Sequence, residues 1–188
     1  MQEFRERGTV TLHDGRKVVV RDIAPGDCPA VSAMVIDNFR HAGNFDRLDD
    51  AARRAYVQAN SIEGVREASA HPDNIACLVA VDVDTGSIVG YRLVRRGIHR
   101  LDGHAVAEGK RLHVARSFTG QGLGAALVDV SAQIARRCGY PRMTAQASGN
   151  SRQFFEKLGF HCVLEQAQND VLKQRSIESL IAYLEKPL

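Results

Sequence analysis

A glycine-rich run in the second half of the chain is the strongest chemical signal in the sequence. It spans residues 118–124, reads FTGQGLG, and lies between a predicted strand and a predicted helix. The first turn of a helix leaves backbone N–H groups unpaired, and glycine allows both positive φ and close approach to an anion. The run therefore predicts a nest of backbone amides that binds a phosphate or a pyrophosphate.

Other interpretations of this run fit the sequence less well. A Walker phosphate loop would continue with Gly-Lys-Ser or Gly-Lys-Thr, where this chain has Gly124-Ala125-Ala126. A dinucleotide fingerprint would need an acidic residue about 20 positions downstream to bind a ribose, and none lies near there. A glycine-rich turn without a ligand stays open as the third alternative.

Composition and charge argue against several classes of function. The chain has 188 residues, of which 44% are apolar and 25% charged, and its net charge of +3 is spread over interleaved residues of both signs. Such a balance does not favour a nucleic-acid partner. The four cysteines are far apart and form no metal-ligand cluster, so no metal is expected. No apolar stretch approaches the roughly 20 residues of a membrane span, and the charged N-terminus lacks a signal-peptide core, so we expect a cytoplasmic protein without a membrane partner.

The elements before the glycine run are predicted to be hairpins and helices. Alternating β-branched residues predict two strands within 9–22, and a nearly continuous apolar pattern predicts a hairpin over 75–94. Helical periodicity predicts one helix up to about Arg40 and a second over about 48–70. Residues 97–104 show no periodicity and are expected to form a loop.

The elements around and after the run alternate between strand and helix. A strand over 111–114 precedes the run, and a helix with a single apolar stripe follows it over 122–138. A short strand, a short helix over 151–158 and two strands near 160–164 and 177–184 complete the chain. We therefore predict an α+β fold, an αβα sandwich whose mixed, mostly antiparallel sheet has about seven strands and is flanked by about four helices.

Several motifs resemble those of one known family. Leu112-His113-Val114, the run that continues to Leu127, Asn150 and the segment 154–160 (FFEKLGF) are similar, in order and spacing, to the conserved motifs of GCN5-related N-acetyltransferases (GNAT). The match is strong over 108–162 and looser over nearly all the rest. The resemblance implies a single GNAT-like domain over 1–188, in which residues 1–7 are a candidate for disorder. It also implies transfer of an acetyl (acyl) group from acetyl-CoA to a primary amine by direct attack in a ternary complex.

The resemblance also implies how acetyl-CoA would be held. The backbone of the strand before the run would pair with the pantetheine arm as an added strand, and the amides of the run would cradle the pyrophosphate. The residues expected to contact the cofactor are Leu112, His113, Val114, Thr119, Gly120, Gln121, Gly122, Leu123, Gly124, Ala125, Asn150 and Phe155.

Two positions depart from the family pattern. Thr119 stands where the glycine motif usually begins with arginine or glutamine, which removes a side-chain contact but leaves the backbone nest intact. Phe155 stands where many members carry a tyrosine that protonates the leaving thiolate, and a phenyl ring has no proton to donate. A thiol with a pKa of about 8.5 is nevertheless a fair leaving group near neutral pH, so the missing acid is tolerable.

Acyl transfer to an amine also needs a base. Glu108 matches a position where family members often carry a glutamate that acts directly or through water, so we expect it to be the general base. His113 is a second candidate, because an unperturbed histidine has a pKa of about 6.5. A catalytically weak module that binds or senses acyl-CoA stays open as the alternative function.

The acceptor is expected to be a small molecule or a peptide that carries an amine. By the resemblance, it would meet the region from Asp37 to Asp50, the loop 97–104 and the C-terminal strands. Within the first of these, residues 40–45 are expected to line the acceptor side. Dimers are common among the similar proteins, so a homodimer is a further expectation.

Overall fold

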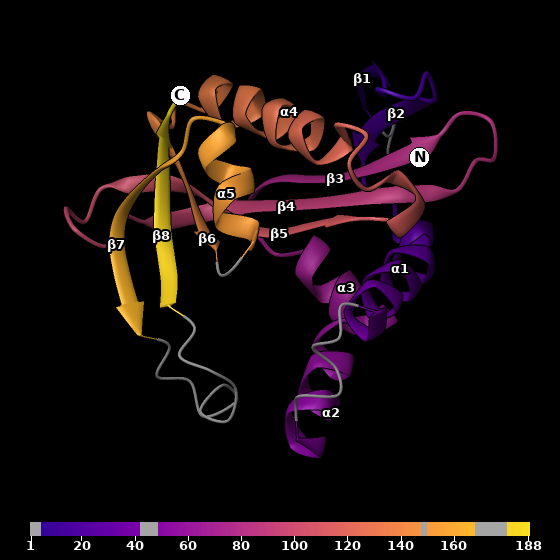
Figure 1. The fold of residues 1–188 in the computed structure, drawn as a ribbon, viewed down its shortest axis with the longest axis horizontal. Coiled ribbons are helices and arrows are strands. Elements are labelled where there is room, and N and C mark those ends of the chain that lie inside the picture. Colours follow the sequence, from indigo (N-terminus) through magenta and orange to yellow (C-terminus); the bar gives the residue numbers. More distant parts are fainter. Residues whose placement is uncertain (1–4, 42–48, 148–149, 168–179) are drawn as a thin grey trace.

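The computed structural model describes residues 5–41, 49–147, 150–167 and 180–188 and shows one mixed sheet with helices on both faces (Figure 1). Its strands are β1 (Glu6–Thr11), β2 (Lys17–Asp22), β3 (Asn74–Asp82), β4 (Ile88–Ile98), β5 (Ala105–Val114), β6 (Arg142–Ala147), β7 (His161–Ala167) and β8 (Leu180–Pro187). Its α-helices are α1 (Cys28–His41), α2 (Asp50–Ala59), α3 (Ile62–Ser69), α4 (Leu123–Arg137) and α5 (Asn150–Lys157). The predicted sandwich and its mixed, mostly antiparallel sheet are confirmed, with eight strands and five α-helices in the described residues.

Each face of the sheet has its own core. On one face, α4 buries its apolar stripe, with Leu123, Leu127 and Ala135 fully enclosed, and α5 packs beside it (Figure 1). On the other face, α1 and α3 pack through Val31, Val35 and Val65 against buried side chains of β3 and β4. The apolar residues that recur at helical spacing in the sequence therefore lie on the buried faces of α1 and α4.

The strands β1 to β5 form an antiparallel meander, and its last hairpin is longer than expected. The pairs Gly97–Val106 and Ile98–Ala105 extend β4 into the segment expected to be a loop, so the connection shrinks to residues 99–104. They also start β5 at Ala105, well before the strand predicted over 111–114. The extension depends on pairing with the neighbouring strand, because the segment has no alternating apolar pattern that would predict a strand.

The expected helix over 48–70 is two helices. α2 ends at Ala59 and is capped by Asn60, whose side-chain amide donates to the Tyr56 carbonyl. α3 begins at Ile62 and is capped by Ser61, whose hydroxyl accepts from the Gly64 amide. These local side-chain bonds end one helix and start the next within two residues.

The sheet order β1-β2-β3-β4-β5-β6-β8-β7 contains a single parallel contact, between β5 and β6. β6 then pairs with β8 and β8 with β7, so β8 lies between two strands that are neighbours in sequence. Of residues 1–7, expected as a candidate for disorder, Glu6 and Arg7 instead start β1, where Arg7 pairs with Asp22 at 2.9 Å. Residues 42–45, expected to face the acceptor, and residues 177–179 of the last predicted strand lie outside the described residues.

Candidate active site

The sheet forks where β5 and β6 separate. The two strands pair in parallel only at Ala107–Met143, Glu108–Thr144 and Gly109–Ala145. Beyond Gly109, β5 continues along β4 to Val114, whereas the described ladder to β6 has ended. A β-bulge lies at the fork, because Arg111 faces Leu93 and Gly109 faces Val94, which leaves Lys110 as the extra residue of β5.

Beyond the fork, two residues of β5 turn their backbone groups away from β4. The Ala115 amide donates to the Val89 carbonyl at 2.8 Å, and backbone groups in an antiparallel pair alternate between the two sides of a strand. His113 therefore bonds toward β4, while Leu112 and Val114 face the open edge. The Asn38 side-chain amide donates to the Val114 carbonyl at 2.8 Å from that side, which agrees with the alternation.

A glycine turn lies next to this open edge and leads into α4. Gly120 and Gly122 have φ of +78° and +86°, a region that favours glycine, and Thr119 before them is extended. The first intrahelical bond of α4 runs from the Ala126 amide to the Gly122 carbonyl at 3.0 Å. The amides of the three residues before Ala126 therefore have no partner within the helix and can serve an anion.

His13, in the turn between β1 and β2, supports the glycine turn. Its backbone amide donates to the Gln121 carbonyl at 3.2 Å, and its ring lies so close to Gly122 that a Cβ there would be 2.9 Å from Nε2. This contact could not be predicted from the sequence, because His13 is more than 100 residues away from the run.

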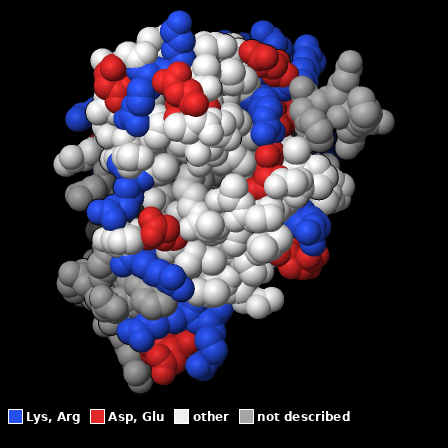
Figure 2. Space-filling view, turned by 90° about the vertical axis from the view of Figure 1, so that its right-hand side faces the viewer, with Lys and Arg blue, Asp and Glu red and all other residues white. Residues whose placement is uncertain are grey.

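Uncharged atoms dominate the end of the molecule to which the N-terminus of α4 points. Figure 2 looks onto this end and shows a continuous uncharged area across its middle, with Lys, Arg, Asp and Glu side chains placed around it. Next to the glycine turn, the Arg16 guanidinium donates to the Ser117 carbonyl at 2.7 Å and lies over the Phe118 ring. An anion at the turn could therefore interact with main-chain amides, with the positive end of the α4 dipole and with this positive charge.

Two phenylalanines of α5 lie near the glycine turn in different ways. A Cβ on Gly124 would lie 3.3 Å from the Phe154 ring and 3.8 Å from Val114, so Phe154 borders both the turn and the open edge. Phe155 is 7% exposed and packs edge-on against the rings of Phe154 and Phe160 in the core. The family motif drew attention to Phe155, whereas the structure brings Phe154 to the site. Asn150 is the first residue of α5, and its side chain lies outside the described part.

Glu108 lies at the fork on the face covered by α1 and α3. Its neighbour Ala107 belongs to the core under α4, and side chains alternate along a strand, so Glu108 points to the opposite face. Its Oε2 is 2.7 Å from the Lys110 Nζ, and its Oε1 accepts a 3.4 Å hydrogen bond from the side-chain amide of Gln146. Gly97 leaves room for it, because a Cβ there would lie 2.8 Å from the Glu108 carboxylate.

The bulge places Arg111 and His113 on the face of Glu108. Arg111 donates to the Asn60 side chain at 2.8 Å and to the Ala59 carbonyl at 3.1 Å, which ties β5 to the junction of α2 and α3. The His113 ring stacks on Tyr91 with 6.4 Å between centroids. Burial, with a smaller effect of Arg111, lowers the pKa of His113 to about 4, so its imidazole is neutral at pH 7 and only weakly basic.

A buried arginine lies beneath the fork on the α4 side. Arg92 is 1% exposed, and its guanidinium donates to the Ser131 hydroxyl at 3.3 Å, the Arg111 carbonyl at 3.3 Å and the Met143 sulfur at 3.6 Å. It fits because Gly109 has no side chain, since a Cβ there would be 2.7 Å from Nη2. Burial lowers the pKa of Arg92 to about 10, so the group remains charged at neutral pH. Arg92 thus joins α4, β5 and β6 where the two strands part.

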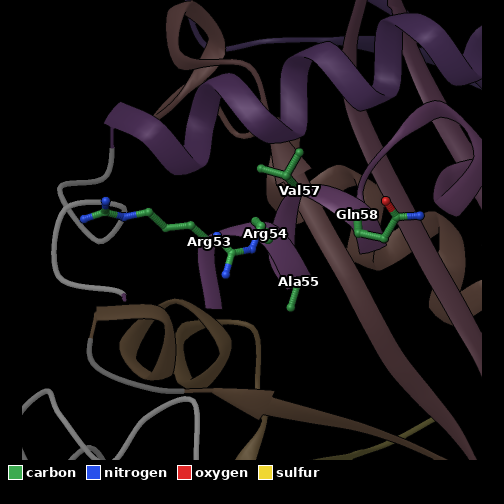
Figure 3. Close-up of a pocket in the computed structure, with 5 residues that line it drawn as sticks. All are labelled: Arg53, Arg54, Ala55, Val57 and Gln58. Atoms are coloured by element: carbon green, nitrogen blue, oxygen red, sulfur yellow. The ribbon is translucent and has the colours of Figure 1, made fainter. Parts of the chain in front are cut away.

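Two clefts open beside the helices on the Glu108 face. One, of about 620 Å³, lies between α3 and the β4–β5 hairpin, and Lys110 and Arg111 line it together with Glu63 and Glu67. The other, of about 600 Å³, is lined along α2 by Arg53, Arg54, Ala55, Val57 and Gln58 (Figure 3). Both volumes are in the usual range for small-molecule sites, roughly 300–1,000 Å³.

The described residues contain neither a metal-ligand cluster nor a helix that could span a membrane. There, His, Cys, Asp and Glu side chains form no group of three or more that could hold a metal ion. In the same part of the chain, no helix is both long and apolar enough to cross a membrane.

Several solved structures are similar to this chain in fold. A structure of a GCN5-related N-acetyltransferase from Kribbella flavida is 21% identical, with a TM-score of 0.68 over 91% of this chain and 98% of that one. The GNAT domain of S. lividans PAT is 21% identical, with a TM-score of 0.62 over 97% of each chain. A candidate streptothricin acetyltransferase from Bacillus anthracis, solved with acetyl coenzyme A, is 17% identical, with a TM-score of 0.54 over 66% of this chain and 68% of that one.

At these identities, the three structures show a shared fold. No curated protein matches the chain. The sequence model of the acetyltransferase (GNAT) family matches residues 45–160, which is more than half of the sequence and includes the fork, the glycine turn and α5. The chain therefore belongs to the GNAT family of acetyltransferases.

Proposed function

We propose that this protein transfers an acetyl group from acetyl-CoA to a primary amine, with Glu108 as the general base. One observation carries the proposal. The open backbone edge at Leu112 and Val114 lies between an amide nest at the N-terminus of α4 and a carboxylate at the fork. The family supports acetyl transfer in general, and the proposal adds the donor, the acceptor group and the residues.

The residues present fit acetyl-CoA. The nest at residues 120–125 matches a pyrophosphate, and a Cβ at Gly120 would meet nothing within 4 Å, so space for a ligand exists there. The backbone edge at Leu112 and Val114 matches the amides of a pantetheine arm, which could pair with it as an added strand, although the Val114 carbonyl already accepts from the Asn38 side chain. Thr119 supplies no charge, so within the run main-chain amides would provide most of the binding.

The chemistry of the site follows from its charges and free amides. Acetyl-CoA supplies an acetyl group activated as a thioester. Glu108 would accept the proton of the amine, directly or through a water molecule, and so release the nitrogen lone pair. The amide of Leu112 or Val114, which faces the open edge, would stabilise negative charge on the carbonyl oxygen. His113 is a poorer base, because its pKa is near 4.

The leaving thiolate would depart without a tyrosine. Phe154 borders the open edge and Phe155 lies in the core beside it, and neither ring has a proton to give. Since a thiol has a pKa of about 8.5, proton transfer from water is sufficient near neutral pH.

The 620 Å³ cleft is the proposed acceptor site. It contains Lys110, two residues from Glu108, and it combines basic Arg95 and Arg111 with acidic Glu63 and Glu67. This mixture suits a small or peptidic amine that also carries polar groups. The cytoplasmic location and the homodimer remain predictions.

The test combines acetyl-CoA with a pooled panel of amines and follows the release of free thiol. Glu108→Gln, which keeps the shape of the side chain, should lower turnover on the order of 100-fold. A thermal shift with CoA serves as the binding control, and Glu108→Gln should leave it unchanged.

The same measurements separate the alternative function. A module that only binds or senses acyl-CoA would show the thermal shift with CoA but release no thiol with any amine. A chain that shows neither effect would contradict both functions, because a ligand that binds only the folded state must stabilise it.

A further inference from the structure

We propose that Lys110 is itself an acetylation site, which the chain modifies in its own active site when no other amine is bound. The inference rests on the proposed function, since it needs acetyl-CoA at the fork. Lys110 is the extra residue of the β5 bulge, so it lies where β5 and β6 part. This position places a primary amine on the protein at the point where an acceptor amine is expected.

The amine of Lys110 already contacts the proposed base. Its Nζ lies 2.7 Å from the Glu108 Oε2. The sequence contains four other lysines: Lys17, Lys157, Lys173 and Lys186. Among the described residues, Lys110 is the only lysine with an ion pair to a carboxylate. An amine needs a base to become nucleophilic near neutral pH, and here the two groups are in direct contact.

The side chain can also move toward the open edge. Leu112 is two residues further along β5, which corresponds to about 7 Å of extended strand. Lys110 is 39% exposed and lines the 620 Å³ cleft, so its flexible four-carbon chain has space to leave Glu108. Both residues belong to one strand, so amine and base are held together without a binding step, which raises their effective concentration.

The reaction balances with the groups present. The Lys110 ammonium gives a proton to the Glu108 carboxylate, and the resulting neutral amine attacks the carbonyl carbon of the acetyl group. A C–N bond forms, the C–S bond breaks, and the electron pair of that bond leaves with the CoA sulfur. The second proton of the nitrogen passes to the thiolate or to water, so the products are N-acetyl-lysine, CoA thiol and one released proton. Acetylation removes the positive charge beside Glu108.

The test uses the full chain and acetyl-CoA with an isotopically labelled acetyl group, in the absence of any amine. Mass spectrometry of the intact protein and of its peptides should show one labelled acetyl group, on Lys110. The rate constant should not change on tenfold dilution of the protein, because the transfer occurs within one chain. Lys157, exposed on α5, is the internal control for chemical acetylation and should react at least tenfold more slowly.

Two variants keep the test decisive. Glu108→Gln should slow labelling of Lys110 on the order of 100-fold while the rate at Lys157 stays the same. Lys110→Arg keeps a positive charge but offers no acyl acceptor, so it should lose the label at this position and retain the CoA thermal shift.

The outcomes separate this inference from the proposed function. If external amines are acetylated while Lys110 stays unlabelled, the inference is wrong and the function stands. Labelling of Lys110 at the same rate in Glu108→Gln, or at the rate of Lys157, would also overturn it. If CoA gives no thermal shift and no amine is acetylated, both proposals fail together.

Discussion

The position of the Glu108 side chain depends on a glycine of the neighbouring strand. Gly97 lies on β4, diagonally across from Glu108, and the carboxylate occupies the space that a Cβ at Gly97 would need. The geometry of the proposed base is therefore set partly by the neighbouring strand.

Replacement of Gly97 by alanine should move Glu108 without removing its charge. The new Cβ would lie 2.8 Å from the Glu108 Cβ and carboxylate, so the side chain must shift. We expect kcat to fall roughly tenfold or more, since a misplacement of about 1 Å at a reacting group is costly, while KM for acetyl-CoA stays the same. Steady-state kinetics measure both constants. Gly26→Ala, where a Cβ meets nothing within 4 Å, is the control, and an equal loss of kcat there would contradict the argument.

His113 predicts a pH dependence of stability. Its folded pKa is about 4, against about 6.5 in an unfolded chain, so between these values the unfolded chain binds a proton that the folded chain does not. The free energy of unfolding should therefore fall as the pH decreases from about 6.5 to 4. At pH 5 it should be lower than at neutral pH by on the order of 2 kcal/mol. Well above pH 6.5, His113 is neutral in both states and should cause no change with pH. Urea unfolding of the wild type and of His113→Phe, which retains a ring against Tyr91, at pH 7.5 and pH 5 measures the difference. A pH response unchanged in His113→Phe would contradict the assignment.

Individual residues were predictable where they belong to a local motif. The glycine turn follows from its own sequence, because positive φ and a helix start are local properties. Glu108 was reached only through the family resemblance. Gly97, Arg92 and His13 act through contacts with other strands, helices or turns, and nothing in their sequence neighbourhoods indicates those contacts.

At the scale of elements, the two ends of α4 allow a matched comparison. Gly120 precedes the helix and Gly139 follows it, with φ of +78° and +82°, and a Cβ at either would meet nothing within 4 Å. Alanine should strain both positions to a similar extent, by about 1–2 kcal/mol. Only Gly120→Ala should raise KM for acetyl-CoA, because only Gly120 belongs to the amide nest. Chemical unfolding and kinetics of both variants test this expectation, and equal effects on KM would argue against the nest.

Replacement of Arg92 should change acetyl-CoA binding without lowering the free energy of unfolding. Methionine in its place has a similar length and carries no charge, and such replacements of a buried charge are often neutral or stabilising by about 1–4 kcal/mol. The Arg111 carbonyl at the bulge would lose its donor, so we expect KM for acetyl-CoA to increase although the free energy of unfolding does not decrease. Ser131→Ala, which removes one acceptor and keeps the guanidinium, is the control. A large loss of stability with an unchanged KM would show that Arg92 only supports the core.

Element boundaries were predicted less well than the elements themselves. The apolar periods of α1 and α4 locate both helices, because each buries a full stripe. The break between α2 and α3 depends on side-chain bonds of Asn60 and Ser61, and the length of the β4–β5 hairpin depends on cross-strand register. These are interactions that a hydrophobic pattern does not contain.

At the scale of the whole molecule, the sheet consists of two parts with a short strand-to-strand contact. The backbone ladder between the meander β1 to β5 and the β6-β8-β7 part has three residue pairs. At the opposite end from the glycine turn, side chains add further links, since Arg142 of β6 lies 2.6 Å from Asp102 and His99 lies 3.0 Å from Glu185 of β8. α4 packs across strands of both parts.

A ligand in the fork should therefore stabilise both parts together. Acetyl-CoA at 100 times its dissociation constant should add about 2.7 kcal/mol to the free energy of unfolding. Amide hydrogen exchange should slow at Leu112 and Val114 on β5 and also along β6, because a ligand between the two strands would make local opening of either strand less frequent. Protection confined to the start of α4 would contradict a ligand that runs through the fork.

The position of β8 between β6 and β7 determines when the site can exist during folding. One edge of β6 has only three pairs with β5, and its other edge is held by six pairs with β8, a strand that begins more than 30 residues later. A chain that is synthesised from its N-terminus can fold the meander, the glycine turn and α4 before β8 is present. At that stage β6, the strand opposite β5 at the fork, lacks its main partner. Closing that long loop carries an entropy cost and slows folding. The end of the site proposed to bind the pyrophosphate can thus form early, whereas the end proposed for acetyl transfer has to wait for one of the last strands to insert.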